Sequence, residues 1–480
     1  MHTVAIDPIS PERLAELLTP SRAERLLAQA HRAQRLLDGR TVWNVNATAT
    51  GGGVAEMLQS LLSYIRGAGI DTRWVVLDGT PEFFRLTKRI HNLLHGTTGD
   101  AGPTGEAERA TYEHVLAPDL AWLREQVSPG DIVLLHDPQT AGLAAGLREA
   151  GAAVIWRCHV GRDAPNDQTE RAWAFLRPYA EQADALVFSR RGYAPEWVDP
   201  ERLAVIPPSL DPFSPKNADL TADRVHATLR TAGLVGLDGS DAAADEGSLL
   251  FRRRDGGEGR VAARQDAVVR GGPVPPEARV VLQVSRWDRL KDMAGVLTGF
   301  CTVLPELPED VHLHLVGPEV SGVSDDPEGA EVLDECIDVF DQSVPEAQAR
   351  IHLTCLPMDD VDENAHLVNA LQRHAAVVVQ KSLVEGFGLT VTEPMWKGRP
   401  VLASKVGGIR DQIVDGESGV LLDDPTDLAA FGRQLADLVV DDERCERIGA
   451  AARERVREQF LGDRHLLQYV DLFETLIHRR

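Results

Sequence analysis

Two carboxylates lie eight positions apart across a glycine-rich turn in the C-terminal half of the chain. Glu385 and Glu393 flank this turn, which follows an apolar run over residues 375–379. We predict a strand, a turn and a helix, with Glu385 before the helix and Glu393 about two turns into it. The first backbone N–H groups of a helix lack internal partners, so such a turn can hold a phosphate while carboxylates bind sugar hydroxyls. The alternative is an ordinary strand-to-helix turn with two solvated glutamates.

Two basic residues follow another apolar run upstream of this turn. Arg286 and Lys291 come after the run at residues 280–284, at a spacing of five. The planar fork of arginine suits phosphate oxygens, and lysine supplies a mobile point charge. In open α/β sheets, ligands bind at the carboxyl ends of the strands. Alone, this segment fits a solvated loop equally well. Together with the two-carboxylate turn, it supplies what the recognition of a sugar nucleotide requires.

The elements that must position these residues read as two α/β halves. Short apolar runs alternate with helical patterns, which predicts parallel sheets covered on both faces. Pro207-Pro208 and Asp211-Pro212 mark a break between the halves. The predicted strands cover residues 42–45, 72–77, 131–135, 153–157, 185–189 and 203–206 in the first half, and 280–284, 312–316, 351–354, 377–380, 401–403 and 419–422 in the second.

The predicted domain boundaries follow from this pattern. The segment at 217–276 carries scattered glycines and six arginines between Arg252 and Arg270. It fits a tolerated surface insertion, a basic flap, or an interface with another subunit. A mobile loop and a small hairpin turning at Asp255-Gly256 both fit its sequence. The predicted parts are a helical extension at 1–38, a first domain at 39–210, a second domain at 211–464 with this insertion, and a last helix at 465–480.

Composition limits the classes of function. The chain has 480 residues and a formal net charge of −24, which argues against nucleic-acid or anionic-membrane binding over the general surface. A phosphate site must therefore be a local basic pocket. Five scattered cysteines lack metal-ligand spacing, so we expect reduced thiols in a cytoplasmic protein. We find no apolar run of membrane-spanning length and no signal-peptide core.

The motifs together resemble a known family. Ser-Arg-x4-Lys at 285–291 followed by Glu-x7-Glu at 385–393 resembles the donor half of retaining glycosyltransferases with the GT-B fold, which has two Rossmann-like domains facing a cleft. Further motifs are similar to trehalose synthases of the glycosyltransferring type. These motifs lie at residues 43–58, 81–92, 136–139, 156–159, 368–373 and 405–416.

The resemblance implies a reaction and its partners. It implies retaining transfer of glucose from a nucleoside diphosphate glucose, such as ADP- or UDP-glucose, to free glucose, giving α,α-trehalose in a reaction that can be reversible. We expect a homodimer that acts without nucleic acid or membrane. No cofactor is required; Mg²⁺ is compatible but not implied, because Arg286, Lys291 and backbone N–H groups can replace it.

Residue roles come from the same resemblance. Arg286 and Lys291 stabilise the charge on the departing nucleotide, Glu385 binds donor-sugar hydroxyls, Glu393 binds the ribose, and His159 contacts the donor glucose. The implied donor-binding backbone comprises Gly51, Gly52, Gly53, Gly386, Phe387, Gly388 and Leu389, and the acceptor side comprises Glu82, Lys88, His91, Asp137 and Gln139. No histidine and carboxylate cluster indicates a metal site.

One departure from the family pattern concerns the acceptor. Relatives often carry an acidic residue two places after the active-site histidine, whereas this chain has Gly161 there and Asp163 two places further on. Asp137 also fits a plain helix cap. The alternatives are therefore a retaining trehalose phosphorylase, a GT-B enzyme with another acceptor or an isomerase, and a catalytically silent sugar-nucleotide sensor.

Overall fold

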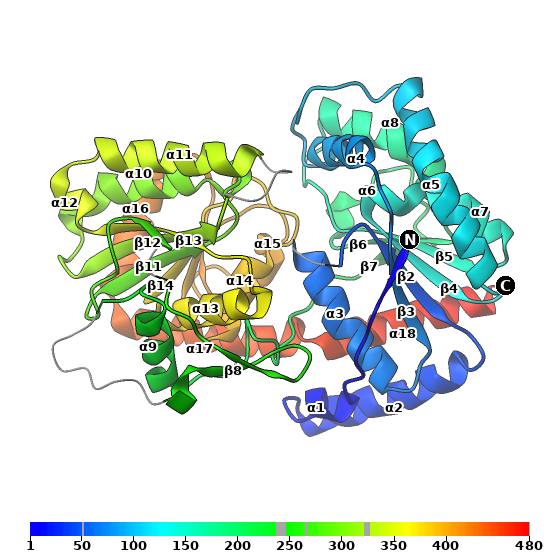
Figure 1. Cartoon of the computed structure of the whole chain (residues 1–480), viewed down its shortest axis with the longest axis horizontal. Helices are drawn as coiled ribbons and strands as arrows, with labels where there is room; N and C mark the ends of the chain where they lie inside the picture. The colour runs from blue at the N-terminus through cyan, green and yellow to red at the C-terminus, as the bar shows by residue number, and fades with distance from the viewer. Residues whose placement is uncertain (50–51, 237–245, 265–266, 321–326, 480) are drawn as a thin grey trace. The chain divides into compact units, whose positions relative to one another are not determined.

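The computed structural model describes residues 1–49, 52–236, 246–264, 267–320 and 327–479. The chain divides into two compact units, Met1–Leu210 with Phe460–Arg480 (unit 1) and Asp211–Gln459 (unit 2). Each unit contains a seven-stranded sheet with helices on both faces (Figure 1). The predicted fold class, α/β with two largely parallel sheets, is confirmed.

The sheet of unit 1 has the order β1-β3-β2-β4-β5-β6-β7. All neighbouring strands run parallel except β1, which pairs antiparallel with β3 at one edge. Most of the central residues are buried, as expected for a parallel sheet covered on both faces. The strands are β1 (His2–Val4), β2 (Val42–Asn46), β3 (Thr72–Val76), β4 (Ile132–His136), β5 (Ala153–Cys158), β6 (Ala185–Phe188) and β7 (Leu203–Val205).

The N-terminal segment and the last helix both belong to unit 1. Arg22 on α2 donates to Asp463 on α18 at 2.7 Å, and Arg32 lies 3.4 Å from Asp471. Residues 1–38 are not entirely helical, because β1 pairs with the free edge of β3. The helices are α1 (Pro11–Ala15), α2 (Pro20–Leu36), α3 (Gly52–Gly67), α4 (Pro81–Leu94), α5 (Glu106–Gln126), α6 (Asp137–Thr140), α7 (Ala144–Glu149), α8 (Asp167–Ala180) and α18 (Gly462–His478).

The sheet of unit 2 repeats this plan, with the order β10-β13-β12-β11-β14-β15-β16. Its edge strand β10 also runs antiparallel, here against β13. The strands are β10 (Val268–Arg270), β11 (Arg279–Val284), β12 (Val311–Pro318), β13 (Ile351–Leu356), β14 (Val377–Gln380), β15 (Val401–Ser404) and β16 (Val420–Leu422). The helices are α9 (Ala222–Thr231), α10 (Met293–Val303), α11 (Pro327–Gln342), α12 (Pro345–Gln348), α13 (Val361–His374), α14 (Leu389–Trp396), α15 (Ile409–Gln412), α16 (Leu428–Val439) and α17 (Asp442–Gln459).

The strand orders locate a switch point in each sheet. In unit 1 the first long strand, β2, lies between β3 and β4; in unit 2 the corresponding strand, β11, lies between β12 and β14. Successive connections leave β2 or β11 in opposite directions there, which opens a crevice at the carboxyl ends of the neighbouring strands. Ligands of open α/β sheets bind in such crevices, so the loops after β2, β4, β11 and β14 are where function is expected.

The segment predicted as an insertion is built into unit 2. It contributes α9, the edge strand β10 and a hairpin formed by β8 (Leu250–Arg252) and β9 (Glu258–Arg260). Of the two forms that the sequence allowed, the structure has the hairpin, and Arg253 N–H donates to Gly257 across its turn. Residues 237–245 and 265–266 lie outside the described residues.

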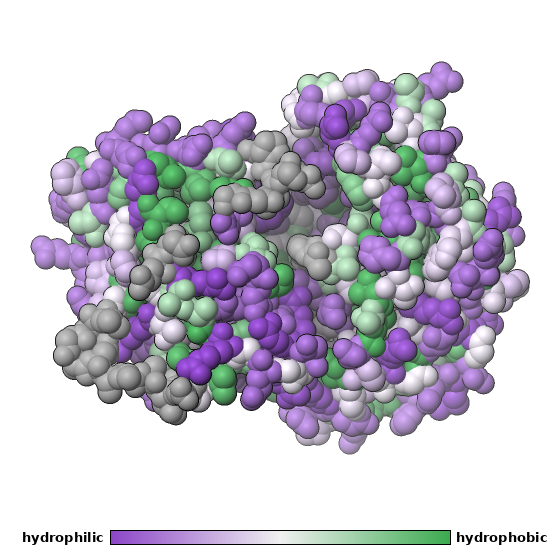
Figure 2. All heavy atoms as spheres, viewed as in Figure 1, coloured by the Kyte–Doolittle hydropathy of each residue, from purple (hydrophilic) through white to green (hydrophobic). Residues whose placement is uncertain are grey.

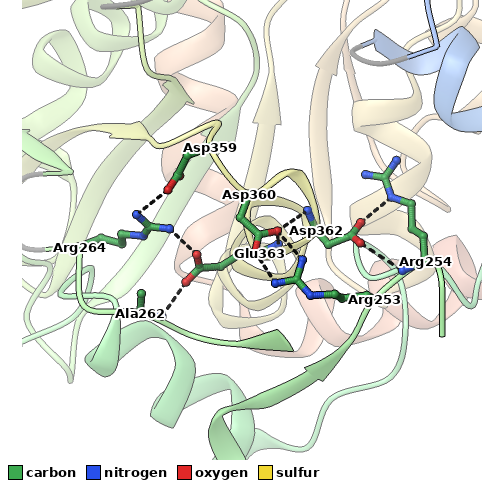
Figure 3. Close-up of polar contacts among 8 residues, drawn as sticks. All are labelled: Arg253, Arg254, Ala262, Arg264, Asp359, Asp360, Asp362 and Glu363. Atoms are coloured by element: carbon green, nitrogen blue, oxygen red, sulfur yellow. Dashed lines mark hydrogen bonds and ion pairs between the residues drawn. The ribbon is translucent and has the colours of Figure 1, made fainter. Parts of the chain in front are cut away.

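Three of the six arginines of this segment, Arg253, Arg254 and Arg264, face acidic residues at the start of α13 (Figure 3). Arg253 forms a bidentate pair with Asp360, and Arg254 lies 2.7 Å from Asp362. Arg264 pairs with Glu363, whose side chain is only 4% exposed. Since Asp360 also caps α13 by accepting from the backbone, these pairs attach the segment to the start of that helix. Their charge is thus neutralised internally, which disfavours the hypothesis of a free basic flap.

Two adjacent glycines after β10 give a matched stability test. Both have left-handed backbone, with φ of 79° at Gly271 and 68° at Gly272. A Cβ at Gly271 would lie 1.9 Å from the carbonyl oxygen of Ile351, whereas a Cβ at Gly272 meets nothing within 4 Å. Gly272→Ala should cost about 1–2 kcal/mol of unfolding free energy. Gly271→Ala should cost about 3 kcal/mol or more, because backbone overlap adds to the same torsional strain.

Urea denaturation monitored by tryptophan fluorescence measures both variants against the parent protein. A substantially larger loss at Gly271 supports the close approach of this loop to β13. Equal losses at the two positions would contradict it.

A hydrophilic surface is expected for a chain with a formal net charge of −24. Hydrophilic side chains cover the outer side of α11 in the view of Figure 2. Among the residues that the structure describes, no helix is both long and apolar enough to span a membrane.

Candidate active site

The loops after β11 and β14, on either side of the switch point of unit 2, are joined by an ion pair. Lys291 donates from Nζ to Oε2 of Glu385, and both side chains are mostly buried. The backbone reinforces the contact, because the Leu383 N–H donates to the Leu290 carbonyl at 2.8 Å. Two residues predicted from separate motifs therefore meet at the carboxyl ends of adjacent parallel strands.

A second ion pair crosses the same two loops. Lys381, at 1% exposure, donates to the carboxylate of Asp292, the residue that follows Lys291. Asp292 has a left-handed backbone with φ of 51°, which is uncommon for a residue other than glycine. The buried ammonium of Lys381 thus anchors the turn that presents Lys291. Sequence reasoning missed this pair, because nothing in the local pattern links residues 89 positions apart.

The glycine turn has the geometry of an anion site. Gly388, with φ of 86°, is the N-cap of α14, so the first helical turn, where backbone N–H groups can bind an anion, follows it directly. Within that turn the Val391 N–H donates to the Gly388 carbonyl at 2.9 Å. Nε2 of Gln412 donates to the carbonyls of Phe387 at 2.5 Å and Gly388 at 3.2 Å, which fixes the turn from behind. The Gly386 N–H donates to Oε1 of Glu385 at 3.2 Å.

The helix begins later than predicted. α14 starts at Leu389, so Glu393 lies about one turn into it and not two. The reason is the left-handed backbone of Gly388, which keeps the preceding residues out of the helix.

Glu393 lies in a buried polar cluster. Its side chain is 7% exposed, with Lys216 Nζ 3.6 Å from Oε1 and Nε2 of Gln372 donating to Oε2 at 3.3 Å. Lys397 is one turn further along and donates to Oδ1 of Asn217 at 2.9 Å. Burial lowers the pKa of Lys397 well below its ordinary value, although Glu393 opposes the shift. The carboxylate of Glu393 is therefore held in place by Lys216 and Gln372 before any sugar hydroxyl binds to it.

The side chain of Arg286 is much more exposed to solvent than that of Lys291. Its side chain is 54% exposed, and it contacts Asp288 at 3.0 Å. An exposed pair of this kind is weak, so the guanidinium can turn toward an arriving phosphate at little cost.

In unit 1, the ends of β4 and β5 bring the predicted residues Asp137 and His159 together with His136. His159 follows β5, and its backbone N–H donates to Oδ1 of Asp137 at 2.7 Å. Nε2 of His159 lies 3.2 Å from Nδ1 of His136, whose Nε2 lies 3.1 Å from Oδ1 of Asn44. Burial lowers the pKa of His136 to about 3 and that of His159 well below the ordinary value, with Arg157 adding to both shifts.

Asp137 is not a side-chain cap of the following helix. It is the first residue of α6, has φ of 62°, and directs its carboxylate to the backbone of His159 instead. Burial raises its pKa to about 7, against the opposing effect of the His159 N–H. A strained backbone beside a perturbed carboxyl is typical of functional sites.

The other predicted acceptor-side residues lie on two helices, α4 and α6. Glu82 and Lys88 are exposed on α4, and His91 packs its ring against His95 with centroids 4.9 Å apart. Oε1 of Gln139 is buried and has no hydrogen-bond partner among the described residues. Gly52 and Gly53 begin α3, while Gly51 lies outside the described residues. The roles of these residues remain predictions.

Gly161 is explained by its neighbour. A Cβ at this position would lie 2.2 Å from Cγ of Tyr193, so the tyrosine ring fills the space of any side chain. Asp163 instead pairs with Arg190. We expect Gly161→Asp to cost about 2 kcal/mol of unfolding free energy by overpacking. In the Gly161→Asp/Tyr193→Ala double variant, the two losses should be non-additive by at least about 1 kcal/mol.

Denaturation of the two single variants and the double variant measures this coupling. Strictly additive losses would show that Tyr193 does not exclude a side chain at position 161.

The sequence is similar to those of known glycosyltransferases. Residues 44–195 match the family model described as trehalose synthase, N-terminal domain, and residues 266–455 match glycosyl transferases group 1. The trehalose synthase of Rubrobacter xylanophilus is 37% identical over 92% of each chain, and that of Pyrococcus horikoshii is 34% identical over 92% of this chain and 91% of the relative. A trehalose phosphorylase of Pleurotus pulmonarius is 26% identical over 86% of this chain and 54% of its own length.

The solved structures support the fold. A trehalose-phosphate synthase from Burkholderia vietnamiensis aligns with a TM-score of 0.64 at 14% identity, covering 92% of this chain and 99% of that one. With two Rossmann-like units and this likeness, the predicted GT-B fold is confirmed. On the identity and coverage of its relatives, this chain belongs to the trehalose synthase family.

Proposed function

We propose that this protein is a retaining glucosyltransferase that forms α,α-trehalose from a nucleoside diphosphate glucose and glucose. The observation that carries the proposal is the meeting of Lys291 and Glu385 at the switch point of unit 2. It joins a cation suited to phosphate with a carboxylate suited to sugar hydroxyls, beside a glycine turn suited to backbone contacts with phosphate.

In this proposal, the Lys291–Glu385 pair is partly replaced when donor binds. The diphosphate takes the ammonium of Lys291 as its partner, and the carboxylate of Glu385 turns to hydroxyls of the donor glucose. Arg286 swings onto the same diphosphate from its exposed position. Glu393 accepts from the ribose hydroxyls at the other end of the turn.

The reaction proceeds by front-face substitution. The bond from the anomeric carbon to the diphosphate oxygen breaks, and its electron pair leaves with the nucleoside diphosphate. The anomeric hydroxyl of the acceptor glucose forms the new bond on the same face, and its proton passes to a phosphate oxygen. Arg286 and Lys291 lower the barrier by stabilising the charge that grows on the leaving group. The protein otherwise acts by orienting the two sugars.

The acceptor side is assigned to the loops of unit 1. His159 is assigned to contact the donor glucose. Asp137 and Gln139, which follow directly after β4, are assigned to the acceptor.

The nearest alternative is a trehalose phosphorylase, which would use the same machinery with inorganic phosphate. The lower identity and partial coverage of the phosphorylase favour the synthase. Product analysis decides between them: purified protein is incubated with glucose and ADP-, UDP- or GDP-glucose, and in parallel with glucose and glucose 1-phosphate, each with and without chelator.

Trehalose with equimolar nucleoside diphosphate, formed equally well in chelator, would support the proposal and rank the donors. Product from glucose 1-phosphate alone would transfer the assignment to the phosphorylase reaction. Strict dependence on added metal would contradict the expectation that Arg286, Lys291 and backbone N–H groups take the place of Mg²⁺.

Two further expectations concern the whole protein. We expect a homodimer, which sedimentation velocity tests directly. We also expect a cytoplasmic location, because all five cysteines are free thiols and persist as such in a reducing compartment.

A further inference from the structure

Three adjacent strands of unit 1 place a chain of side chains behind His159. β2, β4 and β5 are parallel neighbours whose registers pair Asn44 with Leu134 and His136 with Arg157. Asn44 on β2, His136 at the end of β4 and His159 just after β5 are therefore each displaced by two residues along the neighbouring strand, which puts them on the same face of the sheet. Asn44 and His136 are each 2% exposed. The two imidazole planes differ by 17°, with centroids 5.5 Å apart.

The hydrogen bond between the two histidines lies close to the ring planes. The centroids are 5.5 Å apart while Nδ1 of His136 and Nε2 of His159 are 3.2 Å apart, so both nitrogens must lie close to the line that joins the two centroids. The rings therefore meet edge to edge, where a nitrogen lone pair can accept an N–H in line.

The order of protons along this chain follows from chemistry. An amide oxygen only accepts, so Nε2 of His136 carries the hydrogen that Oδ1 of Asn44 receives. A neutral imidazole has one N–H, so Nδ1 of His136 is an acceptor. Its partner, Nε2 of His159, must then be the donor.

The neutral state of His136 is enforced by its surroundings. Burial lowers its pKa to about 3, and the guanidinium of Arg157 adds to the effect. Arg157 is itself fully buried and donates to Nε2 of His465 at 2.9 Å. A proton on His136 would thus be placed near a fixed positive charge without access to water. The titratable groups in its neighbourhood include Arg157, Asp137, His159 and His465.

The backbone of His159 is held by the neighbour of His136 in sequence. Asp137 accepts the His159 N–H at 2.7 Å, and the carbonyl of Asp137 in turn accepts from Nε1 of Trp156 at 3.0 Å. The hydroxyl of Thr140 donates to the His136 carbonyl at 2.8 Å. His159 is therefore fixed at its ring by one residue and at its backbone by the next.

We propose that Asn44 and His136 are positioning residues that hold His159 as the tautomer protonated at Nε2. This tautomer leaves the lone pair of Nδ1 as the acceptor that His159 offers to a ligand. No hydrogen bond to Nδ1 is formed by the described residues, and the side chain of His159 is partly exposed. A sugar hydroxyl is the donor that such an acceptor suits. That last assignment rests on the proposed function, whereas the tautomer itself does not.

The test combines a spectroscopic and a kinetic readout. Solid-state NMR of protein labelled with ¹⁵N and ¹³C in histidine reports which ring nitrogen is protonated, and a His159→Gln variant identifies the signal. We expect a single His159 form, with hydrogen on Nε2 and none on Nδ1. Asn44→Leu removes the terminal acceptor, so His159 should become a mixture of tautomers.

Asn46→Leu is the matched control. Asn46 is also on β2 and 4% exposed, but its Oδ1 accepts from Nε1 of Trp74 and not from His136. The His159 tautomer should be unchanged in this variant. In the transfer assay, Asn44→Leu should lower kcat by about 10- to 100-fold, with little change in KM for the nucleotide sugar.

The outcomes separate this inference from the proposed function. A His159 protonated at Nδ1 or present as a mixture in the parent protein would overturn the inference. So would an unchanged single tautomer in Asn44→Leu. A protein with the predicted tautomer that makes no trehalose would overturn the proposed function and leave the positioning of His159 intact.

Discussion

Arg286→Ala should lower kcat/KM of the glucosyl transfer by about 10²- to 10³-fold and leave the unfolding midpoint unchanged. The first effect follows from the loss of a cation that stabilises the departing diphosphate. The second follows from the 54% exposure of the side chain, whose contact with Asp288 contributes little to stability. Lys291→Met should reduce activity by a similar factor, with some loss of stability because Glu385 is left buried without its partner.

Arg289 provides a matched control in the same turn. It is 48% exposed and pairs with Glu331 and Glu335 on α11, away from the glycine turn. Arg289→Ala should retain the activity of the parent enzyme. Steady-state kinetics with the preferred donor measure all three variants. Equal activity in Arg286→Ala and Arg289→Ala would contradict the assignment of the diphosphate site.

The two glutamates of the glycine turn should separate into a catalytic and a binding role. Glu385→Gln should lower kcat by about 10²-fold or more. An amide in this position no longer neutralises Lys291, and it cannot accept from sugar hydroxyls with a full negative charge. Glu393→Gln should mainly raise KM for the nucleotide sugar, because the proposed ribose contact lies remote from the bond that breaks.

The comparison is internal, since both substitutions keep the size of the side chain. Both glutamates are buried to a similar degree, with side chains 10% and 7% exposed, so non-specific destabilisation should affect them alike. Kinetics at saturating and limiting donor distinguish the two effects. A fall in kcat for Glu393→Gln equal to that for Glu385→Gln would show that the roles are not divided along the turn.

Much of the fold was predictable because it depends on local patterns. Every long strand of the two sheets comes from a short apolar run, and the alternation with helices predicts parallel pairing. The antiparallel edge strands β1 and β10 escaped prediction, whereas the equally short edge strands β7 and β16 were predicted. The segments that form β1 and β10 are predicted from the sequence as a helical extension and as part of an insertion. The start of α14 was misplaced because the conformation of Gly388, and not its residue type alone, decides where the helix begins.

The candidate site was predictable only in part, for a related reason. Arg286, Lys291 and Glu385 carry a recognisable spacing, and strand order then brings Lys291 and Glu385 together. Lys381 has no such spacing, since its partner Asp292 is defined only by the pairing of β11 with β14.

The same holds for the residues behind His159. The motif at residues 136–139 pointed to Asp137 and Gln139, whereas the ring contact of His159 comes from His136. Asn44 becomes visible as its second neighbour only once β2 is known to lie beside β4.

The most direct test of the account follows the sugars themselves. Donor and acceptor glucose are labelled with ¹³C at their anomeric carbons in turn, and the reaction is followed by ¹³C NMR with release of nucleoside diphosphate measured in parallel. The account predicts that both labels appear in a single α,α-linked disaccharide, with one nucleoside diphosphate released for each bond formed. Donor label appearing in glucose 1-phosphate or in a β-linked product, or in free glucose before any disaccharide has formed, would contradict retaining transfer to glucose.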